Sequence, residues 1–273
     1  MSDLAAQETD PPPWHGTFIW YELMTSDRDA AIDFYRQVIP HWTAADAQMP
    51  EMGDFRYTIL SIGSRGIAGL MELPQQACEK GAKPGWVGII GVGDTDAAAK
   101  NIVAAGGAVL REPDDIPNVG RFAIVADPAG TVFEIMTPRP PEQEPPQLDP
   151  ETPGKISWHE LHSGSGQAAA FDFYSGQFGW KTEAEMEMGP RGIYRIFGKG
   201  GVQMGGMMDK PRDMPVSAWG FYVNVEGTDA AVERIASNGG QVTMGPHEVP
   251  GGSWIVHARD PQGAAFSLTA PRR

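Results

Sequence analysis

Gly16-Thr-Phe-Ile-Trp-Tyr-Glu-Leu23 returns 138 positions later as Gly154-Lys-Ile-Ser-Trp-His-Glu-Leu161. Three shorter matches follow in the same order: Asp33-Phe-Tyr35 with Asp172-Phe-Tyr174, Gly106-Gly107 with Gly239-Gly240, and Asp127-Pro-Ala-Gly130 with Asp260-Pro-Gln-Gly263. An ordered repeat of about 130 residues is longer than the units of solenoids and propellers. The sequence therefore predicts two globular modules that arose by duplication.

The chain of 273 residues is long enough for two ordinary domains, and the repeat places the boundary between them. Seven prolines lie between Pro138 and Pro153 among acidic and amide side chains, a composition typical of an extended, semi-stiff connector. We expect four segments: a disordered arm over residues 1–13, a first module over 14–138, a proline-rich linker over 139–153 and a second module over 154–273.

The composition argues against several classes of function. The net charge is −14, and phosphate binding needs clustered Lys and Arg, so neither nucleic acid nor an anionic membrane is expected as a partner. The chain lacks a signal-peptide pattern and an apolar run of membrane-spanning length, which predicts a cytoplasmic protein. Its single cysteine, Cys78, excludes an intrachain disulfide and a cysteine-rich zinc site, and it lies in a polar stretch with no evident activating group.

Each module is predicted to contain a strand, a helix and three strands, twice over. Aromatic and branched residues predict a strand over 18–24, and Ser26-Asp27 precedes a predicted helix over 29–38. The other elements expected in the first module are strands over 55–62, 66–73, 86–92, 108–111, 121–126 and 131–136 and a helix over 94–105, and the second module repeats the pattern from 156 to 269. Helices confined to one face of an antiparallel-rich sheet define an α+β domain whose other face is free to curve around a cleft.

These motifs resemble the vicinal oxygen chelate superfamily (glyoxalases, bleomycin resistance proteins and extradiol dioxygenases), and in particular its tandem two-module members. The resemblance covers residues 14–138 and 154–271. It rests on the first strand and helix of each module, on Gln177-Phe-Gly-Trp180, on Asn238-Gly-Gly-Gln-Val242 and on the Asp-Pro-x-Gly turn before each last strand. It implies paired βαβββ units, with eight strands curled around a cleft in each module. It also implies an internal pseudo-dimer, in a chain that can be monomeric.

Metal enzymes of this superfamily hold a divalent ion in the cleft through four strand positions. The resemblance places at these positions Trp20, Gly69, Val87 and Glu134 in the first module, and Gly205, Gly220 and Ser267 at three of them in the second. His159 matches Tyr21 in the repeat and is expected on the opposite face. Because a divalent site needs about three protein ligands, we expect no resident metal or other cofactor. The alternative is a metal-dependent lyase, of the lactoylglutathione lyase type, or a dioxygenase.

Alternation along a strand predicts which side chains face the cleft. Glu22 and Glu134 are expected there as neighbouring carboxyls. The pKa of one of them would be raised, and a raised pKa allows a carboxyl to act as a general acid or base at neutral pH. The candidate catalytic residues are Glu22, Glu134 and Glu160. The candidate ligand-binding residues are Trp20, Met24, Trp158, His162 and His257.

The sequence favours a protein of the glyoxalase and bleomycin-resistance type that binds a small aromatic or amphipathic molecule. A binding protein and a metal-independent lyase, isomerase or hydrolase-like enzyme are both compatible with it. Two further alternatives are a purely structural role for the carboxyls and a metal site made by Glu160, His162 and His257. Replacing Glu22 or Glu134 by Gln separates a binder from an enzyme, because only an enzyme loses turnover while it keeps affinity.

Overall fold

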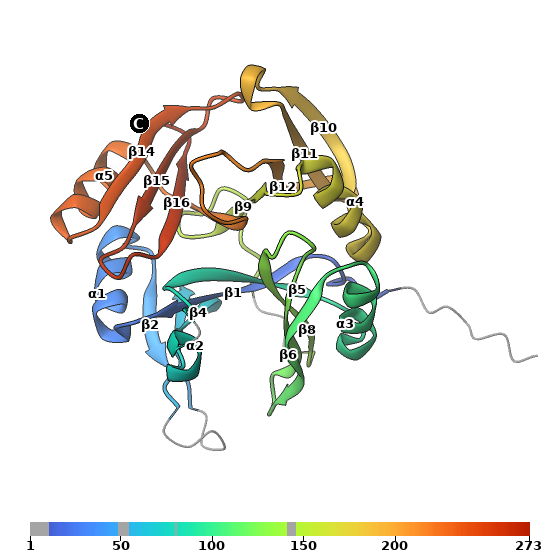
Figure 1. The fold of residues 1–273 in the computed structure, drawn as a ribbon. Helices are drawn as coiled ribbons and strands as arrows, with labels where there is room; N and C mark the ends of the chain where they lie inside the picture. The colour runs from blue at the N-terminus through green and yellow to red at the C-terminus, as the bar shows by residue number, and fades with distance from the viewer. Residues whose placement is uncertain (1–10, 49–54, 80, 141–145) are drawn as a thin grey trace, which may run out of the picture.

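The computed structural model describes residues 11–48, 55–79, 81–140 and 146–273, and it contains two curved eight-stranded sheets (Figure 1). Each sheet comes from one half of the chain, which confirms the α+β class and the two tandem modules of paired βαβββ units. The end strands of each sheet do not pair with each other, so neither sheet closes. Most of the expected arm over 1–13, and residues 141–145 of the expected linker, lie outside the described residues.

The strands and helices of the first module follow the predicted order. They are β1 (Phe18–Thr25), α1 (Arg28–Val38), β2 (Thr43–Asp46), β3 (Thr58–Ile62), β4 (Arg65–Glu72), α2 (Gln75–Glu79), β5 (Gly85–Gly91), α3 (Thr95–Ala104), β6 (Ala108–Ile116), β7 (Gly120–Ala126) and β8 (Val132–Pro138). Cys78 lies exposed in the short helix α2.

The second module repeats this order without a counterpart of α2. Its elements are β9 (Ile156–Ser163), α4 (Gln167–Phe178), β10 (Lys181–Glu187), the 3₁₀ turn η2 (Gly189–Arg191), β11 (Ile193–Lys199), β12 (Val202–Asp209), β13 (Ala218–Asn224), α5 (Thr228–Ser237), β14 (Gln241–Glu248), β15 (Trp254–Arg259) and β16 (Ala265–Ala270). Within the described residues, no helix is long and apolar enough to cross a membrane.

The two sheets have the same topology. Their strand orders are β2-β3-β4-β1-β5-β8-β7-β6 and β10-β11-β12-β9-β13-β16-β15-β14. The first strand of each module lies in the middle of its sheet, where β1 runs parallel to β4 and antiparallel to β5, and β9 pairs with β12 and β13 in the same way. This central place puts the side chains of β1 and β9 between the two halves of each sheet.

Local signals explain where several elements begin and end. Asp27 caps α1 by accepting a hydrogen bond from the amide of Ala30 (3.0 Å), and Asp94 caps α3 in the same way. The helix α4 ends at Gly179, whose φ of 71° is left-handed. The repeated pattern requires one more strand in each module than the sequence signals locate, and these strands are β2 and β10. β2 has no large apolar side chain, and in β10 only Ala184 and Met186 alternate with glutamates.

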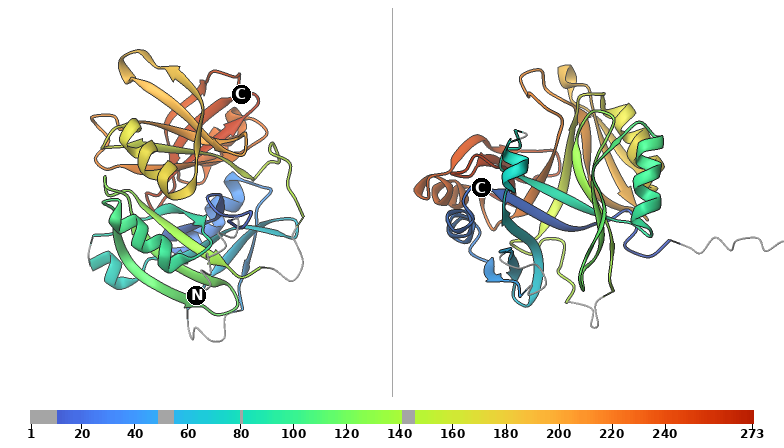
Figure 2. Two further views of the ribbon diagram at one scale, coloured as in Figure 1. Left: turned by 90° about the vertical axis from the view of Figure 1, so that its right-hand side faces the viewer. Right: turned by 60° about the horizontal axis from the view of Figure 1, so that its bottom comes forward.

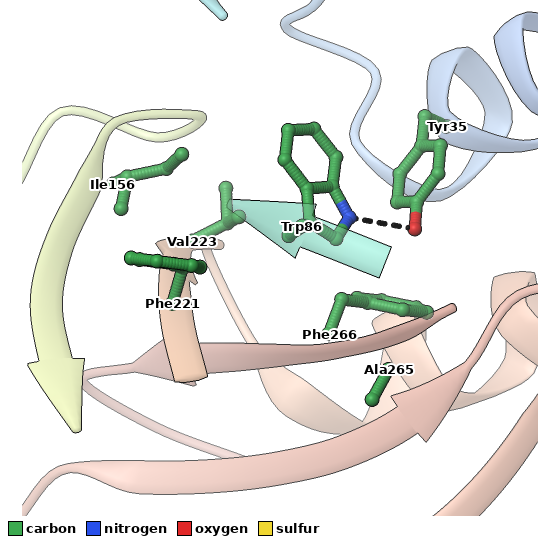
Figure 3. A pocket seen from close by; sticks show the side chains of 7 residues that line it. All are labelled: Tyr35, Trp86, Ile156, Phe221, Val223, Ala265 and Phe266. Carbon is green, nitrogen blue, oxygen red and sulfur yellow. Dashed lines mark hydrogen bonds between the residues drawn. The ribbon is translucent and has the colours of Figure 1, made fainter. Parts of the chain in front are cut away.

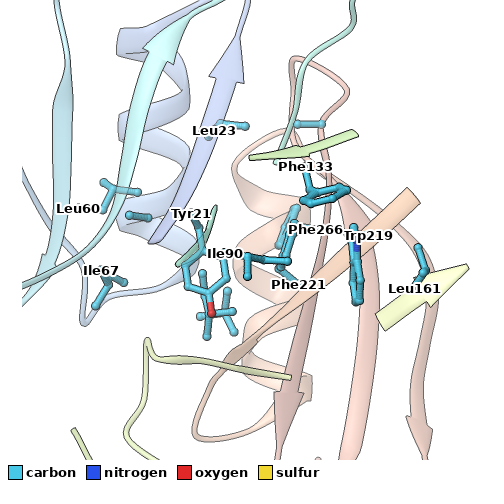
Figure 4. Packing of buried hydrophobic residues seen from close by; sticks show 14 of the residues in the cluster. Tyr21, Leu23, Leu60, Ile67, Ile90, Phe133, Leu161, Trp219, Phe221 and Phe266 are labelled. Atoms are coloured by element: carbon cyan, nitrogen blue, oxygen red, sulfur yellow. The ribbon is translucent and has the colours of Figure 1, made fainter. Parts of the chain in front are cut away.

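The largest apolar cluster is shared by the two modules. Leu23, Ile90 and Phe133 of the first module pack in it together with Leu161 and Phe266 of the second (Figure 4). The side chains of β1 that point into this core alternate with those that point to the opposite face of the sheet. The concave faces of the sheets therefore have separate, smaller apolar clusters of their own.

Reciprocal tryptophan hydrogen bonds join the modules. Trp42 donates from Nε1 to the carbonyl of Gly154 (2.7 Å), and Trp180 donates to the carbonyl of Gly16 (2.6 Å). Each tryptophan thus contacts the backbone just ahead of the other module's first strand. The helix pairs α1 with α5 and α3 with α4 lie side by side on the two flanks of the molecule (Figures 1 and 2).

The repeated motifs of the sequence also meet at this interface. Tyr35 donates to Asp260 Oδ2 (3.1 Å), and Tyr174 donates to Asp127 Oδ2 (3.2 Å). The Phe-Tyr motif of each module therefore contacts the Asp-Pro-x-Gly turn of the other. Much of the repeat that reveals the duplication consists of residues that hold the two modules together.

Candidate functional site

One tyrosine connects the polar side chains on the concave face of the first module. Trp20 donates from Nε1 to the hydroxyl of Tyr57 (2.8 Å), and Tyr57 donates to Glu22 Oε1 (2.9 Å). Met24, the next residue on this face of β1, is half-buried. Tyr21 and Leu23 lie in the core, which is the alternation predicted for this strand.

Glu22 and Glu134 form a carboxyl pair on this face. Trp20 on β1 is level with Ile89 on β5, and Ile89 is level with Glu134 on β8, so these side chains point to the same side. Burial raises the pKa of Glu22 to about 7, against the opposing effects of the Tyr57 hydrogen bond and the Arg111 charge. Burial, and then the charge of Glu22, hold the pKa of Glu134 well above its usual value. The pair therefore retains a proton near neutral pH.

Apolar side chains surround the carboxyl pair. Ile89, Phe122 and Met136 form a buried cluster against which Trp20 packs. The guanidinium of Arg111 lies 4.5 Å from the centre of the Phe122 ring, a distance suited to a cation–π contact. This face is thus largely apolar, and its polar groups among the residues just described are two carboxyls, the Tyr57 hydroxyl, the Trp20 indole N–H and one arginine.

The second module repeats the tryptophan–tyrosine–glutamate arrangement. Trp158 donates to the hydroxyl of Tyr194 (2.8 Å), and Tyr194 donates to Glu160 Oε2 (2.9 Å). The other carboxyl oxygen, Oε1, accepts a hydrogen bond from Tyr222 (2.9 Å) and lies 3.4 Å from His162 Nε2. Glu160 therefore has a phenol on each of its two oxygens.

Ser267 and His257 extend this polar network. His257 Nε2 lies 3.4 Å from the hydroxyl of Tyr222, and His257 Nδ1 lies 3.1 Å from Ser267 Oγ. Burial lowers the pKa of His257, so its imidazole is neutral near pH 7. The equivalent positions of the first module carry different chemistry: Ile89 for Tyr222, Ile124 for His257 and Glu134 for Ser267. The two concave faces have diverged.

The residues at the superfamily's metal positions do not fit a divalent ion in this chain. A Cβ on Gly69 would lie 1.7 Å from the hydroxyl of Tyr57, so the tyrosine occupies the space where a longer side chain would stand. In the second module this place belongs to Gly206, not to the Gly205 expected from the sequence, because Gly206 is level with Glu160 and lies under the ring of Tyr194. Across the part of the chain that the structure describes, no three His, Cys, Asp or Glu side chains converge in a metal-binding group.

His159 lies on the opposite face from Glu160, as the match of the first strands predicts. It is buried at the module interface, where Nε2 lies 2.6 Å from the hydroxyl of Tyr21 and the ring stacks on Phe18 at 4.0 Å. Burial lowers its pKa to about 4. His159 is therefore an interface residue and not part of the candidate site.

Two hollows lie between the modules, away from the candidate residues. The first, about 10 Å³, is lined by Tyr35, Trp86, Ile156, Phe221, Val223, Ala265 and Phe266 (Figure 3). It is about the size of one water molecule. The second, about 320 Å³, lies beside α4 and the turn at Asp127. Neither is lined by a residue that the sequence predicts to be catalytic or ligand-binding.

The sequence interpretation missed Tyr57, Tyr194 and Tyr222, although the first two contact predicted residues in both modules. A signal for Tyr57 and Tyr194 was present in the repeat, since they lie 137 positions apart, within one residue of the 138-residue offset of the first strands. Tyr222 has no such signal, because its counterpart in the first module is Ile89.

The chain matches the model of the Glyoxalase/Bleomycin resistance protein/Dioxygenase superfamily over residues 17–135 and 164–268. The protein CFP32 of Mycobacterium bovis, a glyoxylase by name, is 31% identical over 256 residues, which cover 94% of this chain and 95% of that protein. The anthracycline biosynthesis protein DnrV of Streptomyces peucetius is 29% identical over 269 residues, with 94% of each chain covered.

A solved structure shares the fold at low sequence identity. The Mn(II)-bound glyoxalase from Novosphingobium aromaticivorans is 18% identical, with a TM-score of 0.60 over 94% of this chain and 82% of that one. The family match extends over both modules, and the topology of each sheet agrees with it. The chain belongs to the Glyoxalase/Bleomycin resistance protein/Dioxygenase superfamily.

Proposed function

We propose that this protein binds a small aromatic or amphipathic molecule on the concave faces of its sheets and does so without a resident divalent metal. The observation that carries the proposal is the hydrogen-bonded chain of Trp, Tyr and Glu that recurs in both modules, at Trp20–Tyr57–Glu22 and at Trp158–Tyr194–Glu160. In each module the tyrosine fills the space over a glycine at a family metal position.

Glu22, Glu134 and Glu160 are the polar groups proposed to meet the ligand. Trp20 and Met24 contribute apolar surface in the first module, and Trp158, His162 and His257 contribute in the second. Aromatic and thioether side chains suit flat or adaptable ligands. The relationship to an anthracycline biosynthesis protein supports this ligand class, because anthracyclines are polycyclic aromatic compounds.

The proton held by Glu22 and Glu134 could also take part in a chemical conversion of the bound ligand. A carboxyl with a pKa of about 7 is partly protonated and partly ionised at neutral pH, so it can donate or accept a proton. Such a group supports a lyase or isomerase reaction that consists of proton transfers. In this mechanism Glu22 and Glu134 exchange the proton with the ligand, and Tyr57 holds Glu22 in place.

Ligand screening tests the proposal. A panel of small aromatic and amphipathic compounds is screened by thermal shift, and hits are titrated by quenching of tryptophan fluorescence. We expect Glu134→Gln to keep affinity and to lose any turnover, because the amide cannot carry the proton. Glu72→Gln, an exposed carboxyl at the end of β4, is the matched control and should change neither. Failure of every compound in the panel to bind would contradict the proposal.

A second experiment tests whether binding occurs without a resident metal. The metal content of the untagged protein is measured by elemental analysis before and after mild chelation. We expect metal far below one equivalent and unchanged ligand binding after chelation. Near-stoichiometric Mn, Fe, Ni or Zn that resists washing would favour the metal-dependent lyase or dioxygenase alternative, to which the Mn(II)-bound structural relative points.

A further inference from the structure

The second module contains a continuous row of hydrogen-bonded side chains, of which the proposed ligand site uses only Glu160 and His257. The row runs over Glu160 on β9, Tyr222 on β13, Ser267 on β16 and His257 on β15, four adjacent strands of one sheet (Figure 1). All four side chains point to the concave face, because Tyr222 is level with Ser267 and Ser267 is level with His257. The first module has no equivalent row.

One arrangement of protons, the Nε2–H tautomer of His257, satisfies the contacts along this row. Tyr222 has one hydroxyl proton and donates it to Glu160 Oε1 at 2.9 Å. The phenol oxygen can then only accept, and the Nε2–H tautomer of His257, at 3.4 Å, gives it a donor. In this tautomer Nδ1 carries the lone pair, and Ser267, at 3.1 Å, donates its hydroxyl proton to it.

This arrangement contains the parts of an activated serine. Ser267 is hydrogen-bonded to a neutral imidazole base, and that base is oriented by Tyr222, which is in turn held by the carboxylate of Glu160. A nucleophile, a base and a group that fixes the tautomer of the base are the recurring elements of nucleophilic catalysis, whatever the fold. Tyr194 on the second oxygen of Glu160 restrains the end of the row.

We propose that Ser267 is a nucleophile toward small aryl esters, with His257 as its general base. The hydroxyl oxygen bonds to the acyl carbon, its proton passes to His257 Nδ1, and the bond from the acyl carbon to the aryl oxygen breaks. The products are acyl-Ser267 and a phenol, which takes up the proton delivered through His257. Because Ser267 is only 5% exposed, the proposal is confined to a small acyl group such as acetyl. This activity shares Glu160 and His257 with the ligand site proposed above, but its test, acylation of Ser267, does not depend on that ligand.

The test is reaction of the full chain with p-nitrophenyl acetate. We expect a burst of p-nitrophenolate close to one equivalent and a peptide mass increase of one acetyl group at Ser267. Ser267→Ala should abolish both, and Tyr222→Phe should slow the burst by about tenfold or more, since general-base assistance contributes factors of about 10² or more. Ser157→Ala is the matched control, because Ser157 is a half-buried serine of β9 that bonds to Asn224 and not to a histidine. An unchanged burst in Ser267→Ala, or acetylation elsewhere alone, would overturn the proposal.

A second measurement needs no variant and so cannot fail through misfolding. Long-range ¹H–¹⁵N NMR correlation identifies the protonated nitrogen of each imidazole. We expect His257 as the Nε2–H tautomer at neutral pH. A Nδ1–H tautomer would mean that His257 donates to Ser267 instead of accepting from it, and the proposed activation would be excluded.

Discussion

Tyr21 and His159 occupy equivalent positions in the two modules, and their side chains bond to each other. The hydroxyl of Tyr21 lies 2.6 Å from Nε2 of His159, and the opposite ring nitrogen, Nδ1, lies 2.6 Å from the carbonyl of Met204. Two residues that descend from one ancestral position thus meet at the centre of the interface. Since both are buried, neither can exchange its partner for water.

Removing the Tyr21 hydroxyl should destabilise the protein. Tyr21→Phe leaves Nε2 of His159 without its partner in the core, and such a loss costs about 1–3 kcal/mol. Urea unfolding at pH 7.5 measures it. A double-mutant cycle with His159→Phe provides the control: the coupling between the two sites should be clearly favourable, and a coupling near zero would show that the contact is energetically irrelevant.

Glu22 should make stability fall as the pH rises. Its pKa of about 7 in the folded state exceeds the usual 4.5, so between these values the folded chain binds a proton that the unfolded chain has released. The stability that this proton contributes is lost as the pH rises from about 4.5 to 7. Glu22→Gln should reduce this pH dependence of the unfolding free energy, by up to about 3 kcal/mol across the interval. Chemical denaturation at several pH values measures it, with Glu72→Gln as a variant that should retain the wild-type slope.

His159 should make stability fall as the pH is lowered, the opposite of the effect of Glu22. Its pKa of about 4 in the folded state lies below the usual 6.5, so on acidification the unfolded chain takes up a proton that the folded chain does not. Stability should therefore decrease as the pH falls from about 6.5 to 4. The double variant Glu22→Gln/Glu134→Gln should expose this dependence in the same denaturation series. A flat profile in the double variant would contradict the burial of a neutral His159.

Two glycine-to-alanine substitutions should change the stability of the protein in opposite directions. In Gly69→Ala the new Cβ would lie 1.7 Å from the Tyr57 hydroxyl, so the ring must move and the Trp20–Tyr57–Glu22 chain must break, at a cost of about 1–3 kcal/mol. In Gly176→Ala, inside α4, the Cβ meets nothing within 4 Å, and the helix should gain about 0.5–1 kcal/mol. Thermal unfolding of both variants measures the contrast, which would be lost if the Tyr57 ring were free to move aside.

Most of the fold could be predicted from the sequence, because duplication retains the residues that two copies need to pack together. The Phe-Tyr and Asp-Pro-x-Gly motifs are both hydrogen-bonded across the interface, and they are among the motifs on which the family resemblance rests. The edge strands β2 and β10 are harder to locate, since each has only one paired neighbour. The apolar signal is absent from β2 and limited to Ala184 and Met186 in β10.

The candidate site was predicted only in part. Alternation along β1 places Trp20 and Glu22 on one face, but it says nothing about which distant side chain lies above them. Tyr57 is 35 residues from Glu22, and its position over Gly69 depends on the register between β3 and β4. In the second module, Tyr222 and His257 come together only because β13, β16 and β15 are neighbours in the sheet.

Joining the modules in one chain has a consequence for the affinity of binding. In a dimer of identical single modules, any substitution appears in both faces at once. Here the reciprocal anchors Trp42 and Trp180 are retained, while Glu134 in one face corresponds to Ser267 in the other. A compound that recognises one face meets a different set of groups on the other. A compound that binds to both faces should therefore do so with two different affinities, where a symmetric ancestor would have offered two equal sites.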